Sequence, residues 1–133
     1  VAPVAFTIDS IDALTREQFG PVLHIVRYKS SQLDKVINDI NGRNYGLTFG
    51  VHSRNESFAA EVAQKMRVGN VYINRNIIGA VVGVQPFGGQ GLSGTGPKAG
   101  GPHYLQRFVT EKTITNNTAA LGGNASLLAL GDE

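Results

Sequence analysis

Apolar and polar positions in the first 74 residues follow a pattern typical of alternating strands and helices. Residues 2–8 and 22–28 are rich in β-branched and aromatic side chains, which favours strands. Pro3 restricts the first of these to a sheet edge or to the start of a strand. The near-continuous apolar run over residues 45–52 predicts a strand buried on both faces, and residues 70–74 predict a further short buried strand.

A first helix is predicted between the second and third of these strands. Its apolar positions recur at i, i+3, i+4 and i+7, namely Leu33, Val36, Ile37 and Ile40. Ser31 with Asp34 three residues later has the pattern of a capping box at its start. The pair Asn41-Gly42 predicts its end.

A second helix is predicted between the third and fourth strands. Phe58, Val62 and Met66 form one apolar stripe along it. Ser53 with Glu56 predicts the N-terminal cap, and Glu61 with Lys65 predicts an i, i+4 ion pair. Gly69 lies where a glycine commonly ends a helix.

This order of elements predicts an α/β fold with a mainly parallel sheet and crossover helices. Beyond it, residues 75–102 carry no periodic pattern. A short helix is expected over residues 102–108, with proline in its first turn. Residues 110–115 alternate as a strand does, and residues 116–133 form a tail of small residues.

The segment 86–102 contains seven glycines. Glycine concentrates where φ must be positive or where backbone must approach another group closely. We therefore expect an ordered wall of a ligand site built from backbone. A disordered linker is the alternative, although linkers favour Ser, Glu and Lys over an ordered Pro-Phe-Gly-Gly corner.

The composition narrows the classes of function. The chain has 133 residues, a net charge of +2 and scattered basic residues, so no nucleic-acid partner is expected. It contains no cysteine, which excludes disulfides and a cysteine nucleophile within these residues. No apolar stretch approaches the roughly 20 residues that span a bilayer, and no secretory signal is visible.

Individual motifs are weaker signals. Residues 94–99 match the G-x-G-x-x-A pattern of dinucleotide-binding turns, but no strand precedes them, as that motif requires. His24, His52 and His103 are isolated, so no metal site is expected. Glu17 precedes Phe19-Gly20-Pro21 and a predicted strand, where it is either a solvated loop acid or a carboxylate at a cleft.

Several stretches together resemble the C-terminal part of the aldehyde dehydrogenase superfamily. They follow one another in the order and spacing of that superfamily from residue 17 to residue 96. They are residues 17–22 (EQFGPV), 44–47 (NYGL), 69–74 (GNVYIN), 86–89 (PFGG) and 93–96 (SGTG). Within the superfamily, residues 74–89 are similar to the 1-pyrroline-5-carboxylate dehydrogenase module of bifunctional proline utilization proteins. Residues 117–127 resemble the C-terminal motif of those proteins.

This resemblance implies an NAD-dependent oxidation of L-glutamate γ-semialdehyde to L-glutamate in proline catabolism. It implies that Glu17 binds the nicotinamide ribose hydroxyls and that Phe19 packs near the nicotinamide. Gly79 and Ala80 would form a turn whose backbone N–H groups hold the substrate carboxylate. Phe87 would wall the aliphatic part of the substrate. Backbone donors suit a carboxylate where no side chain blocks its approach.

The family's nucleophilic cysteine and general-base glutamate lie upstream of Glu17. With Val1 at the start instead of methionine, we expect a fragment of a longer parent polypeptide, inactive by itself, whose upstream proline dehydrogenase domain uses FAD. Residues 1–109 would complete the catalytic domain. Residues 110–133 would form the strand of an oligomerisation flap and a sealing tail. The resemblance implies a homo-oligomer in the bacterial cytoplasm, with peripheral membrane association of the parent left open.

A second hypothesis is a catalytically empty assembly or tunnel-sealing module of the same fold. Such a module has no need of the cofactor and substrate positions at Glu17, Phe19, Gly79 and Ala80, so their presence argues for the enzyme.

Overall fold

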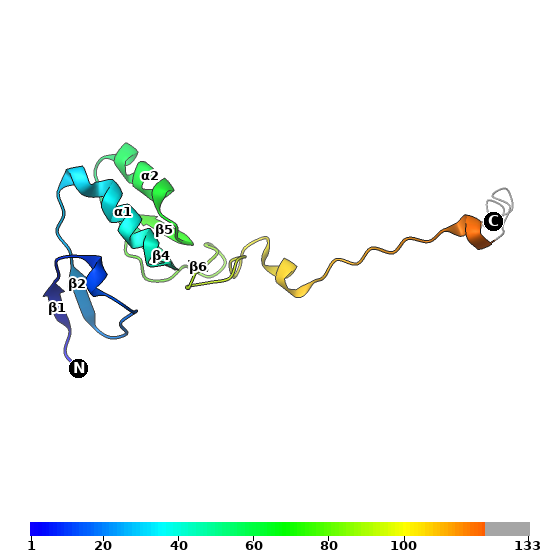
Figure 1. Cartoon of the computed structure of the whole chain (residues 1–133), viewed down its shortest axis with the longest axis horizontal. Helices are drawn as coiled ribbons and strands as arrows, with labels where there is room; N and C mark the ends of the chain where they lie inside the picture. The colour runs from blue at the N-terminus through cyan, green and yellow to red at the C-terminus, as the bar shows by residue number, and fades with distance from the viewer. Residues whose placement is uncertain (122–133) are drawn as a thin grey trace.

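The computed structural model describes residues 1–121. It contains a compact body of short strands and two helices, from which the C-terminal segment extends away (Figure 1). The strands are β1 (Val4–Thr7), β2 (Val22–Ile25), β3 (Tyr45–Gly46), β4 (Thr48–Val51), β5 (Asn70–Ile73) and β6 (Gln90–Gly91). The helices are α1 (Leu33–Gly42) and α2 (Glu56–Lys65), with 3₁₀ turns η1 (Ile11–Ala13), η2 (Ser30–Gln32), η3 (Tyr104–Phe108) and η4 (Thr118–Leu121).

The strands pair in three separate two-stranded sheets. β1 runs parallel to β2, β4 runs parallel to β5 with α2 as the crossover, and β3 is antiparallel to β6. The α/β content and the parallel β4–β5 unit agree with the sequence prediction. The strands predicted for one mainly parallel sheet do not all join within residues 1–121, where β2 pairs with β1 and not with β4. Periodicity locates strands but does not identify their neighbours.

The core lies between the two helices and β4. Ile37, Val62 and Met66 are buried together. Phe49, Phe58 and several other apolar side chains pack against them. The core contains the whole stripe predicted for α2 and Leu33, Ile37 and Ile40 of the stripe predicted for α1, but not Val36. Burial of such side chains stabilises the fold by about 1.5–3 kcal/mol each.

A side-chain amide joins the ends of the two helices. Asn41 Nδ2 donates to the Lys65 carbonyl at 2.9 Å, and Asn41 Oδ1 accepts from the Arg67 amide at 2.8 Å. Because these two backbone groups flank Met66, the Asn41 amide fixes the backbone on both sides of a core residue.

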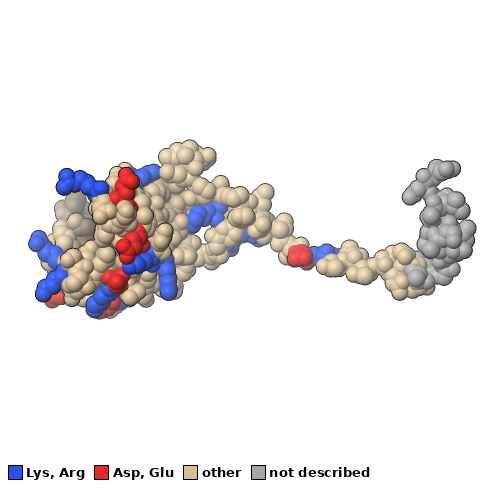
Figure 2. Space-filling model, turned by 90° about the horizontal axis from the view of Figure 1, so that it is seen from above, with Lys and Arg blue, Asp and Glu red and all other residues tan. Residues whose placement is uncertain are grey.

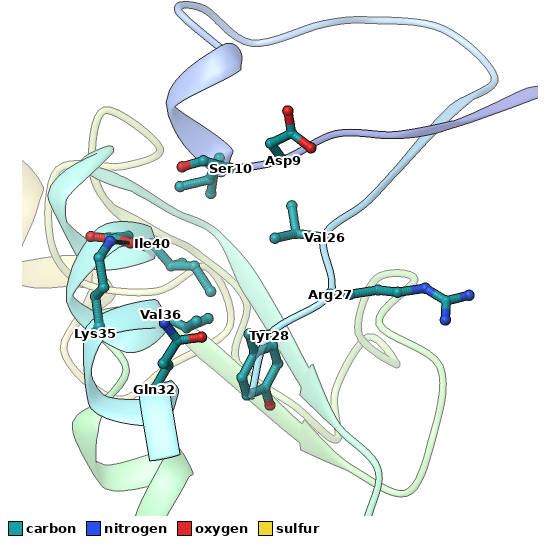
Figure 3. A pocket seen from close by; sticks show the side chains of 11 residues that line it. Asp9, Ser10, Val26, Arg27, Tyr28, Gln32, Lys35, Val36 and Ile40 are labelled. Atoms are coloured by element: carbon teal, nitrogen blue, oxygen red, sulfur yellow. Dashed lines mark hydrogen bonds and ion pairs between the residues drawn. The ribbon is translucent and has the colours of Figure 1, made fainter. Parts of the chain in front are cut away.

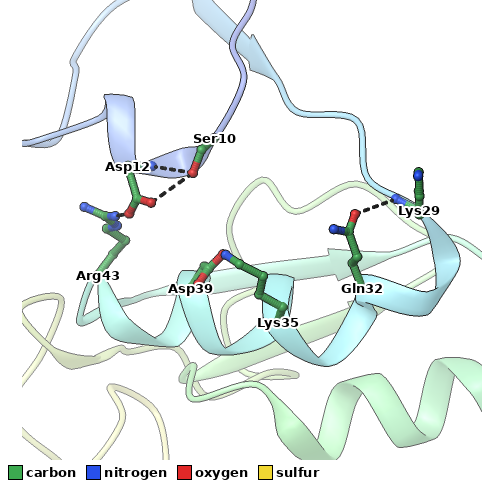
Figure 4. Close-up of polar contacts among 7 residues, drawn as sticks. All are labelled: Ser10, Asp12, Lys29, Gln32, Lys35, Asp39 and Arg43. Atoms are coloured by element: carbon green, nitrogen blue, oxygen red, sulfur yellow. Dashed lines mark hydrogen bonds and ion pairs between the residues drawn. The ribbon is translucent and has the colours of Figure 1, made fainter.

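Ion pairs connect η1 to α1 (Figure 4) and α1 to α2. Arg43 at the end of α1 pairs with Asp12 of η1, and Ser10 caps that turn. Lys65 of α2 binds Asp34 of α1 at 2.8 Å and Glu61 at 2.7 Å, which confirms the predicted Glu61–Lys65 pair. The hydrogen bonds that Lys65 donates to Asp34 and then to Glu61 raise its pKa above the ordinary value. Figure 2 shows acidic and basic side chains interleaved over the body.

The predicted helix caps are wrong at both N-termini. Asn55, not Ser53, caps α2 by accepting from the Phe58 amide at 3.1 Å, and Ser53 Oγ accepts from the Asn55 amide. Ahead of α1 a 3₁₀ turn intervenes, and Gln32 Oε1 accepts from the Lys29 amide where Ser31 was expected to cap. Neighbouring polar residues offer equivalent cap acceptors, so sequence alone does not choose among them.

Gly69 does not end α2, whose last residue is Lys65 and whose cap, Met66, already has extended backbone. The predicted strand 45–52 divides at Leu47 into β3 and β4, and among its residues only Gly46 and Val51 are buried. The short helix predicted over 102–108 is present as η3. Residues 110–115 are extended but pair with no strand within residues 1–121. Their pairing in a flap stays a prediction.

Candidate functional site

The turn at Gly79 and Ala80 is held from the strand that precedes it. Gly79 has φ of +59°, a conformation that glycine adopts without strain. The Tyr72 hydroxyl donates to the Gly79 carbonyl at 2.9 Å. The Arg75 guanidinium lies 4.6 Å from the centre of the Tyr72 ring. A cation over a ring face is attracted to it, so the ring is held as well as the hydroxyl.

Some backbone amides around this turn donate a hydrogen bond within the protein and others do not. The Ile78 amide donates to Asn76 Oδ1 and the Val81 amide donates to Gln85 Oε1, both at 3.3 Å. Between them, the amides of Gly79 and Ala80 donate to no acceptor within residues 1–121. Two adjacent N–H groups without an acceptor carry partial positive charge, which suits an anion.

Phe87 is fixed by its backbone on two sides. Its own N–H and C=O pair with Ala99 at 3.0 Å each. On the other side, Asn70 Nδ2 donates to the Pro86 carbonyl at 2.9 Å, and Asn70 Oδ1 accepts from the Gly88 amide at 3.2 Å. Lys98 Nζ also donates to the Gly88 carbonyl at 2.9 Å. The half-buried Phe87 ring therefore projects from a backbone with little freedom.

The glycine-rich segment is ordered, as expected. Its glycines let backbones touch: a Cβ at Gly89 would lie 2.8 Å from the Gly46 carbonyl oxygen, and one at Gly94 would overlap the Gly89 carbonyl. Ser93 Oγ accepts from the Gly46 amide at 3.1 Å. The same segment lines a cavity of about 340 Å³ together with Arg107. Close packing of backbones thus accounts for part of the glycine content, which we had interpreted from the sequence as the wall of a ligand site.

Glu17 and Phe19 lie in the loop between η1 and β2. Glu17 is exposed and lines a cavity of about 280 Å³ with His24, Arg43 and Tyr45. Phe19 is 90% exposed, so its ring can pack against a planar ligand. A carboxylate can accept hydrogen bonds from two ribose hydroxyls, so the residues present fit a nicotinamide nucleotide.

The predicted site residues therefore fall into two groups. Gly79 and Phe87 are held by side chains of β5, and Ala80 adjoins Gly79. Glu17 and Phe19 belong to a separate loop. Sequence reasoning did not identify Asn70 and Tyr72, because they hold residues 7 to 18 positions away with no periodic signal.

A further cavity of about 260 Å³ lies between α1 and the segment that follows β2 (Figure 3). Val36 and Ile40 of α1 face Val26 and Tyr28 across it. Sequence reasoning missed this cavity because each apolar residue was assigned to its own element.

Within residues 1–121 no group of three or more His, Asp or Glu side chains is placed to hold a metal ion. In the same part of the chain, no helix has both the length and the apolarity to cross a bilayer.

Comparison with known proteins identifies the family to which this fold belongs. Residues 1–114 match the model of the aldehyde dehydrogenase family. Over 114 residues the chain is 58% identical to bifunctional protein PutA of Rhizobium meliloti, covering 86% of this chain and 9% of that protein. Over 102 residues it is 43% identical to 1-pyrroline-5-carboxylate dehydrogenase of Oceanobacillus iheyensis, covering 77% of this chain and 19% of that protein.

A solved structure supports the same conclusion. A mutant of Bradyrhizobium japonicum proline utilization A (PutA) superimposes with a TM-score of 0.80 at 59% identity, over 90% of this chain and 12% of that chain. The chain belongs to the aldehyde dehydrogenase family. The resemblance inferred from the sequence is confirmed, and this chain spans about a tenth of the PutA relatives and a fifth of the separate dehydrogenase.

Proposed function

We propose that this chain is the C-terminal part of an NAD-dependent dehydrogenase that oxidises L-glutamate γ-semialdehyde, formed from 1-pyrroline-5-carboxylate, to L-glutamate. The names of the relatives support this reaction. The parent polypeptide supplies the cysteine nucleophile, which is absent from these 133 residues. The chain alone is therefore inactive. In a bifunctional parent, an upstream proline dehydrogenase domain would use FAD.

The pair of open amides at Gly79 and Ala80 carries this proposal. A carboxylate accepts hydrogen bonds from two adjacent N–H groups, and such charge-assisted bonds are stronger than neutral ones. An aldehyde substrate with a carboxylate at its other end fits this donor pair, whereas a simple alkyl aldehyde leaves both amides unused.

The remaining residues have complementary roles. Phe87 contacts the methylene carbons of the substrate and excludes water from them. Glu17 binds the ribose hydroxyls, and Phe19 covers one face of the nicotinamide. Bound NAD supplies the hydride acceptor.

The test measures NADH formation by the full-length protein with glutamate semialdehyde. We expect Gly79→Val and Phe87→Ala to raise KM for this substrate at least about tenfold, because each disturbs a direct contact. Thr113→Val, in the C-terminal extension, is the control. Wild-type kinetics in both site variants would refute the assigned site.

A second candidate function is assembly or tunnel sealing in a homo-oligomer. The observation that favours it is the exposure of Phe108, Val109 and Ile114 along the extended segment. The tail motif of residues 117–127 lies mostly outside the described residues. Deleting residues 117–133 and measuring mass in solution and the lag of the coupled reaction tests this role. An unchanged mass and lag would remove it.

A further inference from the structure

Two side chains on one face of β5 hold the loop that contains the substrate-binding residues. Asn70 and Tyr72 alternate with Val71 along the strand, so they project to the same side, about 7 Å apart. We propose that Asn70 and Tyr72 are positioning residues that set the separation between the carboxylate-binding turn and the Phe87 ring, and so select the chain length of a semialdehyde that bears a carboxylate. This inference rests on the proposed function.

Tyr72 determines the direction of one of the two open amides. The Gly79 carbonyl and the Ala80 N–H belong to one planar peptide group and point in opposite directions. The Tyr72 hydroxyl binds that carbonyl at 2.9 Å, so it also fixes where the Ala80 N–H points. Tyr72 is only 6% exposed and its ring lies against Arg75, which leaves the hydroxyl little freedom.

Asn70 determines the direction of the Phe87 side chain. The Pro86 carbonyl belongs to the peptide group before Phe87, and the Gly88 N–H belongs to the peptide group after it. Asn70 binds both, at 2.9 Å and 3.2 Å. Since both peptide planes are held, φ and ψ of Phe87 are held too, and the direction of its Cα–Cβ bond follows.

Strand β5 links the carboxylate-binding turn to the Phe87 ring. β5 is paired with β4 over four residues, from Thr48 opposite Asn70 to Val51 opposite Ile73. The loop residues between the turn and the ring are largely exposed, including Val82 at 97%. The strand therefore spaces the turn and the Phe87 ring, because its side chains form hydrogen bonds at both ends of the loop between them.

The experiment uses the full-length protein and three substrates: glutamate semialdehyde, succinate semialdehyde (one carbon shorter) and pentanal, which has five carbons and no carboxylate. The variants are Tyr72→Phe, which keeps the ring and its contact with Arg75, and Asn70→Ser. Matched controls are Tyr28→Phe and Asn41→Ser. Tyr28 is partly exposed and its hydroxyl has no hydrogen bond within residues 1–121. Asn41 makes the same two-bond clamp as Asn70 around Met66.

For Tyr72→Phe we expect KM for glutamate semialdehyde to rise about fivefold, as for loss of one hydrogen bond, with kcat and the pentanal kinetics retained. For Asn70→Ser we expect the preference for glutamate over succinate semialdehyde to fall about fivefold. Both controls should keep wild-type preferences, even though Asn41→Ser lowers the melting temperature.

Unchanged preferences in Tyr72→Phe would overturn the inference, as would an equal loss with pentanal, because a purely structural role affects all substrates alike. If Asn70→Ser does not fold, the kinetics of Tyr72→Phe alone decide whether the inference holds. A wild-type protein without activity on glutamate semialdehyde refutes the proposed function. An active wild type with unaltered Tyr72→Phe selectivity refutes only the positioning role.

Discussion

Gly69 lies directly against the carbonyl oxygen of Gly88, so that a Cβ on Gly69 would overlap that oxygen. The same Cβ would lie 2.8 Å from the Gly89 Cα. The residue that leads into β5 is thereby packed onto the Pro-Phe-Gly-Gly corner, backbone against backbone. This contact explains the glycine at position 69 better than the helix end that the sequence suggested.

Gly69→Ala should therefore destabilise the full-length protein. Backbone has to shift to admit the methyl group, because neither Gly88 nor Gly89 has a side chain that could move aside, and we expect a loss of about 3 kcal/mol. Thermal or urea unfolding measures it. Gly42→Ala is the matched control, since a Cβ at Gly42 would meet nothing within 4 Å. Equal stability of the two variants would contradict the packing argument.

The contribution of the Lys65 ion pairs should persist at alkaline pH. Asp34 and Glu61 raise the pKa of Lys65 in the folded state. A raised folded pKa gives a stabilisation that is complete below the unfolded value of about 10.4 and declines as pH rises through the folded pKa. The stability difference between wild type and Lys65→Met should thus be constant from pH 7 to 9.5 and shrink above it. A difference that already vanishes by pH 9 would count against the pairing.

Glu17→Gln should weaken cofactor binding without altering the aldehyde site. An amide oxygen is a weaker acceptor for ribose hydroxyls than a carboxylate, so KM for NAD should rise about tenfold. Steady-state kinetics at saturating semialdehyde measure the change. Glu56→Gln removes a similar exposed carboxylate at the start of α2 and should leave KM for NAD unaltered. If only the KM for the aldehyde rose, the assigned role of Glu17 would be contradicted.

The isolated chain should not unfold cooperatively. Large apolar side chains such as Phe6, Phe19 and Val82 are exposed, and its strands form only two-stranded sheets within residues 1–121. Two-stranded sheets are marginally stable by themselves. Expressed alone, the 133 residues should bind a hydrophobic dye and aggregate. A sharp melting transition of a monomer would refute this expectation.

The sequence predicted those parts of the fold that depend on periodicity. The stripes on α1 and α2 and the positions of β1, β2 and β5 agree with the structure. The caps at Ser31 and Ser53 were wrong by one to two residues, since several polar neighbours can accept the same backbone bonds. Strand pairing was partly wrong because each strand's partner is fixed by tertiary contacts.

The site was predictable only as a set of positions. The family resemblance carried by motif spacing implied Glu17, Phe19, Gly79, Ala80 and Phe87 as site residues, and their roles stay predictions. It gave no access to the hydrogen bonds that orient them, because Asn70 and Tyr72 act on backbone groups of a loop without regular structure. Polar residues inside a short apolar strand, at alternate positions, are the signal that could have indicated them.

The alternation of β5 has a consequence for misfolding. If β5 slipped by a single residue against β4, Asn70 and Tyr72 would both turn to the opposite side of the ribbon, and Val71 and Ile73 would replace them. Neither replacement can donate or accept a hydrogen bond, so the turn and the ring would lose their supports together. Misaligned molecules would then lose both supports in one step and would discriminate less between aldehydes than molecules with either support alone.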